Sequence, residues 1–187
     1  MKDVMLDIET LGVGKRAVIL SIALLQFDKE SGDLGDQLYL VLNSDSQRGV
    51  GRTTDASTIH WWDSQSGEAK EVLTQAETGG VKWEEALREV TEFLHPIKGV
   101  TVWSNGANFD IAILEEAYYL AGKKLPWTFW KTRCVRTLHD LCKEISGISC
   151  KQQVTYPTVA HNALEDCKFQ IEYCVKAYNR LKGKENE

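Results

Sequence analysis

Apolar and polar residues follow two kinds of pattern along this chain, and each kind predicts a different secondary structure. Short runs rich in branched and aromatic residues predict β-strands at about residues 3–8, 17–28, 37–42, 100–104 and 132–135. Longer stretches in which apolar residues recur every three or four positions predict helices at about residues 82–95, 109–122, 137–145 and 162–181. Three early strands followed by alternating helices and strands predict an α/β fold, with a mixed central sheet flanked by helices.

Acidic residues end the first predicted strand, where Asp7, Ile8 and Glu9 follow an apolar run. Side chains alternate between the two faces of a strand, so Asp7 and Glu9 point to one face while Ile8 turns into the core. Two carboxylates are therefore displayed side by side. Seen alone, such a pair is more often part of a solvated strand edge.

A third acid, Asp110, is expected where the strand at 100–104 passes into the next helix, because helical periodicity begins at Phe109. Catalytic groups are often carried at such junctions, since the carboxyl ends of strands open into the ligand crevice of α/β folds. Seen alone, an aspartate in a first helical turn is equally well explained by its favourable interaction with the helix dipole.

The last predicted helix supplies a fourth acid and a histidine. Asn162 followed by Glu165 resembles a capping box, so this helix is expected to start at about residue 162. Asp166 then borders the apolar stripe and faces inward, whereas Glu165 faces solvent. His161 lies just outside the helix, on a segment that is freer to swing. Seen alone, this histidine is more often an ordinary surface or core residue.

Taken together and in this order, the four carboxylates and the histidine indicate a single site. Hard cations such as Mg²⁺ and Mn²⁺ prefer carboxylate oxygens, so two such ions are predicted to be held by Asp7, Glu9, Asp110 and Asp166. His161 is then predicted to act as the general base that takes a proton from an attacking water. This combination predicts phosphodiester hydrolysis.

The same motifs resemble those of the DEDD exonucleases with the ribonuclease H-like fold, in the DEDDh branch whose last motif is a spaced histidine and aspartate. The three family motifs match Asp7 with Glu9, Asp110, and His161 with Asp166. The similarity extends from residue 3 to about residue 181. Within this branch, the run from Thr58 to Trp62 and the lack of extra domains are most similar to a small phage and bacterial group, which includes the exodeoxyribonuclease DexA and exonuclease VIII-like exoribonucleases.

The resemblance implies a metal-dependent 3′-5′ exonuclease that releases nucleoside 5′-monophosphates from the 3′ end of single-stranded DNA or RNA, or from 3′ overhangs. It implies that Thr10 and Leu11 meet the terminal nucleotide, and that Asn108 and Phe109 line the same pocket. Leu11 departs from the commoner threonine or glycine, and Ser104 replaces the usual histidine before the second motif; neither change removes a metal ligand. Because small family members often pair, a homodimer is one of the oligomeric states left open.

Two other functions stay open at this point. A ribonuclease H-like endonuclease would share the acidic cage, although the spacing from His161 to Asp166 speaks against it. A non-catalytic nucleic-acid-binding module would be expected to have lost an acid or the histidine, whereas all of them are present.

Residues 43–80 show no clear periodicity, which predicts a long irregular segment. Long ordered loops in compact domains are commonly functional. Trp61 and Trp62 lie in the middle of this segment. For each of them two interpretations are open, since an indole can anchor the loop to the core or can stack on a terminal base.

Length and composition fit one soluble domain. The chain has 187 residues, of which 43% are hydrophobic, so a single domain is expected over residues 1–187 with a frayed tail from about residue 182. No apolar stretch approaches a membrane span and no signal-peptide pattern opens the chain, which predicts a cytoplasmic protein, with no membrane partner, in a bacterial cell or phage-infected host. The five cysteines are odd in number and lack a Cys-x-x-Cys spacing, so free thiols are expected.

The net charge of -5 argues against a protein that holds nucleic acid by bulk positive charge. It does not argue against a nuclease, because part of the negative charge belongs to the predicted metal cage. Local basic clusters occur at Arg48 with Arg52, at Lys123 with Lys124, and at Lys131, Arg133 and Arg136. Each cluster alone is more often a solvated face than a phosphate site.

Overall fold

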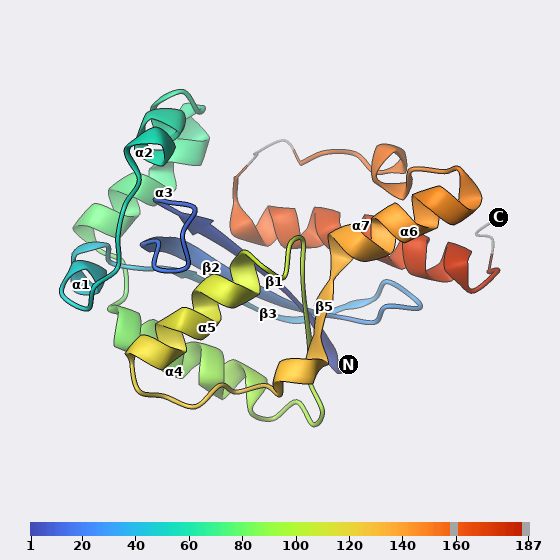
Figure 1. Cartoon of the computed structure of the whole chain (residues 1–187), viewed down its shortest axis with the longest axis horizontal. Helices are drawn as coiled ribbons and strands as arrows, with labels where there is room; N and C mark the ends of the chain where they lie inside the picture. Colours follow the sequence, from blue (N-terminus) through green and yellow to red (C-terminus); the bar gives the residue numbers. More distant parts are fainter. Residues whose placement is uncertain (158–160, 185–187) are drawn as a thin grey trace.

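The computed structural model describes residues 1–157 and 161–184, and a five-stranded sheet forms its centre (Figure 1). The strands lie in the order β3-β2-β1-β4-β5; β2 pairs antiparallel with both β1 and β3, whereas β4 pairs parallel with both β1 and β5. Their bounds are Asp3–Thr10 (β1), Ile19–Phe27 (β2), Leu34–Val41 (β3), Thr101–Ser104 (β4) and Thr132–Cys134 (β5). This mixed sheet confirms the predicted fold class.

Helices cover both faces of the sheet. Apolar residues of α4 and α5 pack on one face, and those of α6 and α7 pack on the other (Figure 1). The helices are Asp45–Arg48 (α1), Ala56–Asp63 (α2), Gly67–Thr78 (α3), Trp83–Leu94 (α4), Asp110–Leu120 (α5), Val135–Ser146 (α6) and Ala163–Leu181 (α7), with short 3-10 turns at Phe129–Lys131 (η1) and Cys150–Gln153 (η2). The four helices predicted from periodicity are confirmed as α4, α5, α6 and α7.

Alternation along β1 divides the core between the two faces. Val4 and Ile8 pack into the cluster formed with α4 and α5, whereas Met5 packs into the cluster formed with α6 and α7. Asp7 and Glu9 lie two and four residues after Met5 and therefore share its face. The period of the strand thus places both carboxylates toward α7.

The pairing of β1 with β4 ends before β1 does. The parallel ladder joins Asp3, Val4 and Met5 to β4 and goes no further, while β1 continues beside β2 as far as Thr10. The second half of β1 therefore has no strand neighbour on the β4 side. Ligand crevices of α/β sheets lie at such carboxyl ends.

Residues 43–80 contain three helices, so the prediction of an irregular segment was wrong. Helix α3 buries Ala69, Val72 and Ala76, which recur every three or four positions and pack in a small cluster with Trp62 of α2. Two of these three side chains are alanines, and they add little apolar area to the periodic signal. The pattern was present in the sequence but too weak to stand out.

Other sequence predictions concern the cysteines and the chain end. Cys167 and Cys174 are buried on α7 as small core residues, and all five cysteines are free thiols, as predicted. Within the described ranges, no helix combines the length and the apolar character that crossing a membrane requires. Helix α7 ends at Leu181, and residues 185–187 of the predicted tail lie outside the described residues.

Replacing Trp62 tests how α2 is attached to the sheet. Trp62 is 1% exposed, and its Nε1 donates a hydrogen bond of 2.9 Å to the carbonyl oxygen of Thr10. Trp62→Ala is expected to lower the free energy of unfolding by about 3–5 kcal/mol because it removes this bond and leaves a cavity. Trp61 is 40% exposed, so Trp61→Ala serves as the matched control and should cost much less. Urea unfolding of both variants measures the difference, and equal losses would contradict the placement of Trp62 in the core.

Candidate active site

Asp7 and Glu9 lie at the open end of β1. Asp7 is 8% exposed, and its Oδ1 accepts a hydrogen bond of 2.7 Å from Nε2 of Gln170 on α7. Glu9 pairs across the sheet with Ser21 of β2 and lies on the same face. Ile8, between them, is 4% exposed in the opposite core. The strand therefore displays the two carboxylates as the sequence predicted.

Asp110 is the first residue of α5, where the chain leaves β4. The connecting turn contains Gly106 with a φ of 127°, a conformation that residues with a Cβ rarely adopt, and its carbonyl accepts a hydrogen bond of 2.7 Å from the Phe109 N–H. The turn returns the chain to β1, where the backbone of Ile8 hydrogen-bonds to the Asp110 carboxylate. Asp110 is thus 4% exposed and held beside Asp7.

The start of α7 is fixed by a side-chain cap. The Oδ1 atom of Asn162 accepts hydrogen bonds from the backbone N–H groups of Leu164 at 3.1 Å and Glu165 at 3.2 Å. This cap confirms the predicted helix start. The Glu165 carboxylate pairs with Lys168 at 2.7 Å, so the reciprocal half of a capping box is replaced by an ion pair.

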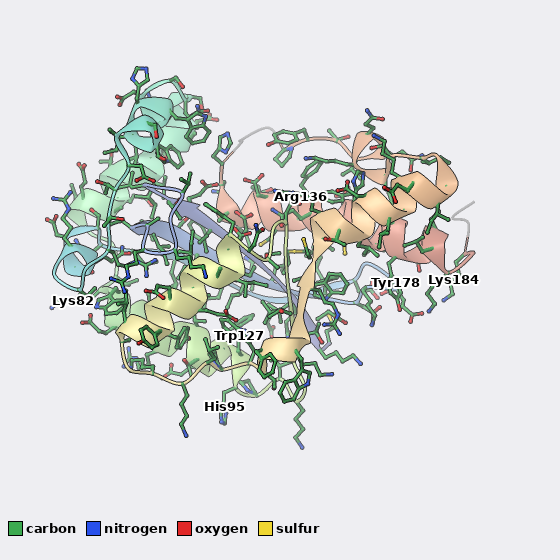
Figure 2. The ribbon with its side chains drawn as sticks, in the orientation of Figure 1. Lys82, His95, Trp127, Arg136, Tyr178 and Lys184 are labelled. Carbon is green, nitrogen blue, oxygen red and sulfur yellow. The ribbon has the colours of Figure 1, made fainter. Side chains whose placement is uncertain are left out.

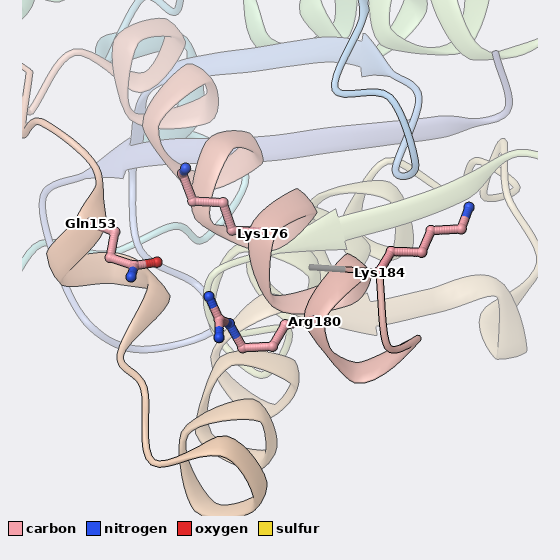
Figure 3. A pocket seen from close by; sticks show the side chains of 4 residues that line it. All are labelled: Gln153, Lys176, Arg180 and Lys184. Atoms are coloured by element: carbon pink, nitrogen blue, oxygen red, sulfur yellow. The ribbon is translucent and has the colours of Figure 1, made fainter. Parts of the chain in front are cut away.

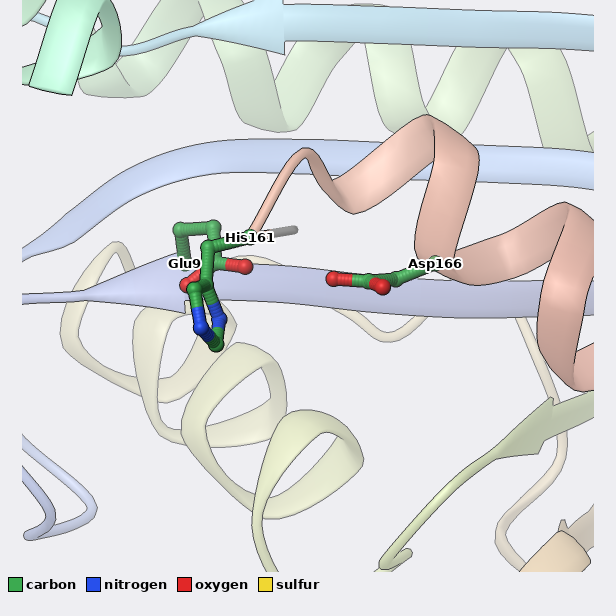
Figure 4. A group of neighbouring side chains, drawn as sticks. All are labelled: Glu9, His161 and Asp166. Atoms are coloured by element: carbon green, nitrogen blue, oxygen red, sulfur yellow. The ribbon is translucent and has the colours of Figure 1, made fainter. Parts of the chain in front are cut away.

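His161 and Asp166 flank this cap. His161 has a φ of 64°, a left-handed conformation that is uncommon for residues other than glycine and is frequent at functional sites. Its backbone hydrogen-bonds to the Asp166 carboxylate, which ties the histidine to the first turn of α7. Figure 4 shows the side chains of Glu9, His161 and Asp166 gathered together, and their ligand atoms lie within 4.8 Å of one another.

All five predicted catalytic residues line one cleft of about 240 Å³. They reach it from the end of β1, the start of α5 and the start of α7, which are far apart in the sequence: Asp7, Glu9, Asp110, His161 and Asp166. The structure therefore brings the whole predicted set together.

Burial raises the pKa values of all four carboxylates, and repulsion by the other acids adds to the shifts of Asp7 and Glu9. Burial, and then the charges of the other three acids, raises the pKa of Asp7 well above its ordinary value. Burial together with the charges of Asp166 and Asp110 raises the pKa of Glu9 to about 8. Burial raises the pKa of Asp110 to about 7 and that of Asp166 to about 6, although backbone hydrogen bonds oppose both shifts. The charged form of this cage therefore requires a positive counter-charge.

The donor set fits a divalent metal ion. Carboxylate oxygens are the ligands that Mg²⁺ and Mn²⁺ prefer, and a cation between them would relieve the repulsion that raises their pKa values. Gln170 adds a further oxygen beside Asp7, because its Oε1 is buried and has no hydrogen-bond partner among the described residues. Burial also lowers the pKa of His161, which favours a neutral imidazole.

A second pocket, of about 300 Å³, adjoins the acidic cleft. Glu9, Thr10, Trp61 and Phe109 line it, so Glu9 and Phe109 belong to both hollows. The Trp61 ring meets the His161 ring edge-on, with centroids 4.7 Å apart and an interplanar angle of 80°. Trp62 therefore anchors its segment to the core, whereas Trp61 lies at the site.

Of the other residues expected to meet the substrate, Thr10 lines the second pocket, whereas Leu11 and Asn108 line neither pocket. Thr10 is 6% exposed, and its hydroxyl donates a hydrogen bond of 2.7 Å to the carbonyl of Gly12. Leu11 packs against the small cluster that contains Trp62. Asn108 is exposed and belongs to the lining of neither pocket.

Seven residues of the cleft were not identified as site residues from the sequence: Ile8, Asn105, Arg136, Lys151, Tyr156, Phe169 and Gln170. Gln170 follows Asp166 by one helical turn, so a polar residue at this inward position was a usable signal. Arg136 belonged to a basic cluster that was interpreted as a solvated face, but it lies in the first turn of α6, where β5 passes into that helix (Figure 2). Lys151 and Tyr156 lie in a connection without periodicity and carried no signal.

Solved structures of two exonucleases share this architecture. The nuclease domain of 3′hExo, a DEDDh family member bound to rAMP, matches with a TM-score of 0.59 and 12% identity, covering 99% of this chain and 94% of that one. E. coli exonuclease I in complex with a dA16 oligonucleotide matches with a TM-score of 0.66 and 12% identity, covering 97% of this chain and 43% of that one. These likenesses establish the ribonuclease H-like fold.

Sequence comparison narrows the class. The chain belongs to the family described as the 3′-5′ exoribonuclease Rv2179c-like domain, whose model matches residues 2–178. It is also 26% identical over 199 residues to the exodeoxyribonuclease of Enterobacteria phage T4, covering 91% of this chain and 86% of that relative. The protein is therefore a metal-dependent 3′-5′ exonuclease of the DEDDh family, which confirms the resemblance seen in the motifs.

The raised pKa values predict how the metal-free protein responds to pH. The folded protein holds protons on Asp166, Asp110 and Glu9 up to about pH 6, 7 and 8, whereas the unfolded chain releases them near pH 4. The resulting stability is present at low pH and is lost as the pH rises through these values. The melting temperature in EDTA is therefore expected to fall between about pH 5 and pH 8, and saturating Mg²⁺ should reduce the fall.

Asp110→Asn is the matched variant for this experiment. It removes one of the titrating groups, so its melting temperature in EDTA should fall less with pH and should be at least that of the parent at high pH. Its rise on adding Mg²⁺ should be smaller, and cleavage should be lost. Identical pH profiles and identical Mg²⁺ stabilisation in parent and variant would contradict the role of Asp110 in the cage.

Proposed function

We propose that this exonuclease removes nucleotides one at a time from the 3′ end of single-stranded DNA or RNA and releases nucleoside 5′-monophosphates. The observation that carries this proposal is the convergence of four carboxylates, two of them buried and two half-buried, and one histidine in a single cleft. A neighbouring pocket, lined by Trp61 and Phe109, offers space for the base next to the scissile bond. These two adjoining pockets suit a hydrolytic centre beside a nucleotide pocket.

Asp7, Glu9, Asp110 and Asp166 would hold two Mg²⁺ or Mn²⁺ ions, directly or through water. When bound, these ions supply the positive charge that stabilises the attacking and leaving oxygens of a phosphodiester. The side chains contribute fixed geometry, because Asp7 is oriented by Gln170 and Asp110 by the backbone of Ile8. Hydrogen bonds of this kind set the direction of these two carboxylates.

His161 is proposed as the general base. Its pKa is lowered by burial, so its imidazole is neutral and able to accept a proton at physiological pH. The ring lies near Glu9 and Asp166, yet hard divalent ions favour oxygen over imidazole nitrogen, which supports a proton-accepting role over a ligand role. The edge-on contact with the Trp61 ring limits the rotation of the His161 imidazole.

Cationic and aromatic side chains of the two pockets would position the substrate. Arg136 and Lys151 are the cations in the lining of the acidic cleft, and each can pair with a phosphate oxygen. Trp61, which is 40% exposed, can stack on the terminal base, since base stacking on an indole contributes about 1–3 kcal/mol. Local positive groups thus compensate for the net charge of -5 at the point of binding.

Digestion of matched 5′-labelled DNA and RNA oligonucleotides tests the proposed function. With Mg²⁺, products should shorten from the 3′ end in single-nucleotide steps, and EDTA should stop the reaction. Trp61→Ala should give the same ladder at a higher KM because it loses the stacking contact. Internal cuts would indicate an endonuclease, and binding without cleavage in Mg²⁺ and in Mn²⁺ would indicate a non-catalytic module; either result would overturn the proposal.

Replacing His161 separates the base from the metal cage. A general base contributes about 10²–10⁴-fold to the rate, so His161→Ala should lose activity on that scale while binding Mn²⁺ and oligonucleotide nearly as the parent does. Asp166→Ala should lose both activity and metal. In the parent, the single-turnover rate should rise with pH, with a midpoint below about 6.5 because burial lowers the pKa of His161. A parental rate in His161→Ala, or loss of Mn²⁺ binding in the folded variant, would show that the roles are assigned wrongly.

A further inference from the structure

A basic hollow lies between α7 and the η2 turn, with a volume of about 240 Å³. It is lined by Gln153, Lys176, Arg180 and Lys184, so among the residues that the structure describes no carboxylate belongs to it (Figure 3). We propose that this basic hollow binds a backbone phosphate of the substrate strand, several nucleotides upstream of the 3′ end. The inference rests on the proposed function and adds a second contact that depends on substrate length.

Two of the three cations in the basic hollow have no ion-pair partner in residues 1–157 and 161–184. Lys184 pairs with Glu30 at 3.1 Å, and Lys182 pairs with the same carboxylate at 3.0 Å. Lys176 and Arg180 take part in no ion pair there, and the Nε of Arg180 is buried without a hydrogen-bond partner. A buried guanidinium N–H that lacks an acceptor is costly, which indicates that an anion completes the site.

The polar groups of the basic hollow suit a phosphodiester. Figure 3 shows the head groups of Gln153, Lys176 and Arg180 around the hollow, whereas the Lys184 ammonium points away from them. A guanidinium and an ammonium can neutralise a single phosphate charge, and the guanidinium presents its donors in a planar fork that matches phosphate oxygens. The Gln153 amide adds a neutral donor.

The same face of α7 leads from the catalytic cleft to the basic hollow. The η2 turn contributes Lys151 to the cleft and Gln153 to the hollow. Between them, Lys151 Nζ lies 5.8 Å from the centroid of the Phe169 ring and 5.9 Å from that of Tyr173. Phe169, Tyr173 and Arg180 follow one another at helical spacing along α7. Phe169 and Tyr173 are themselves buried, with Lys151 of η2 over their rings, so the cations lie at the two ends of the α7 face on which η2 packs.

The distance along α7 sets the length of substrate that can reach the basic hollow. Lys176 and Arg180 follow Asp166 by 10 and 14 residues, which corresponds to about 15 and 21 Å of helix. At about 3.4 Å per stacked nucleotide, these spans correspond to about four to six nucleotides. A dinucleotide therefore cannot fill both sites, whereas a longer oligonucleotide can.

A length series on the full chain tests this inference. The double variant Lys176→Gln/Arg180→Gln is compared with the parent and with Lys123→Gln/Lys124→Gln, which removes the same charge from the exposed turn after α5. For an oligonucleotide of roughly twelve nucleotides, the α7 variant should show a KM raised roughly tenfold and a salt dependence of binding that is shallower by about 0.7, which corresponds to the loss of one phosphate contact. Hydrolysis of a dinucleotide should be unchanged in all three proteins.

The outcomes separate this inference from the proposed function. If the α7 variant keeps the parental KM for the long oligonucleotide, or if the control variant loses as much, the inference is wrong although exonuclease activity stands. If the parent cleaves neither substrate, the proposed function fails. Fluorescence anisotropy of the labelled long oligonucleotide then still decides whether Lys176 and Arg180 bind it.

Two further measurements distinguish nucleic-acid binding from binding of a small anion, and a lost contact from a folding defect. Inorganic phosphate is titrated into the parent and the α7 variant; phosphate binding that the variant loses while its affinity for the long oligonucleotide is unchanged would overturn the assignment to nucleic acid. Because Arg180 is partly buried, Arg180→Gln could unfold the chain. In that case Lys176→Gln alone should still raise the KM for the long oligonucleotide, and Arg180→Lys, which keeps the charge, should preserve the salt dependence better than the neutral variant.

Discussion

Repulsion among four carboxylates that converge in one cleft is the constraint on which this site depends. Asp7, Glu9, Asp110 and Asp166 come from three elements; burial raises the pKa of each, and the charges of the other acids raise those of Asp7 and Glu9 further. The fold opposes the repulsion in part, since Asp110 and Asp166 lie in the first turns of α5 and α7, where the helix dipoles favour negative charge. Cations must compensate the repulsion that the helix dipoles do not offset. Metal binding and catalysis therefore follow from the same arrangement of carboxylates.

The topology of the sheet creates the position in which these charges can meet. Because the ladder between β1 and β4 stops at Met5, the end of β1 is left without a strand neighbour on that side, and α5 and α7 begin there. The N-terminal ends of two helices and the carboxyl end of a strand thus converge on one point. Helix α2, attached through Trp62 to the backbone of Thr10, carries Trp61 to the edge of the same cleft.

Local patterns in the sequence were sufficient for the acidic cage but not for its surroundings. The alternation of β1 and the cap at Asn162 are each determined by a few neighbouring residues, so the facing of Asp7, Glu9 and Asp166 followed from spacing alone. Lys151 reaches the cleft only because the η2 turn folds back against α7, which is a tertiary effect without a periodic signal. The helices of residues 43–80 were missed because alanines carry much of the buried face of α3.

Calorimetric titration of Mn²⁺ into the parent protein, repeated in buffers of different ionisation enthalpy, tests the central claim most directly. If the four carboxylates form a cage whose pKa values are raised by missing counter-charge, the protein should bind two ions and release protons between about pH 6 and pH 7, with fewer protons released as the pH rises toward 8. If Mn²⁺ binds but releases no protons at every pH tested, or if Mn²⁺ does not bind, the account is contradicted.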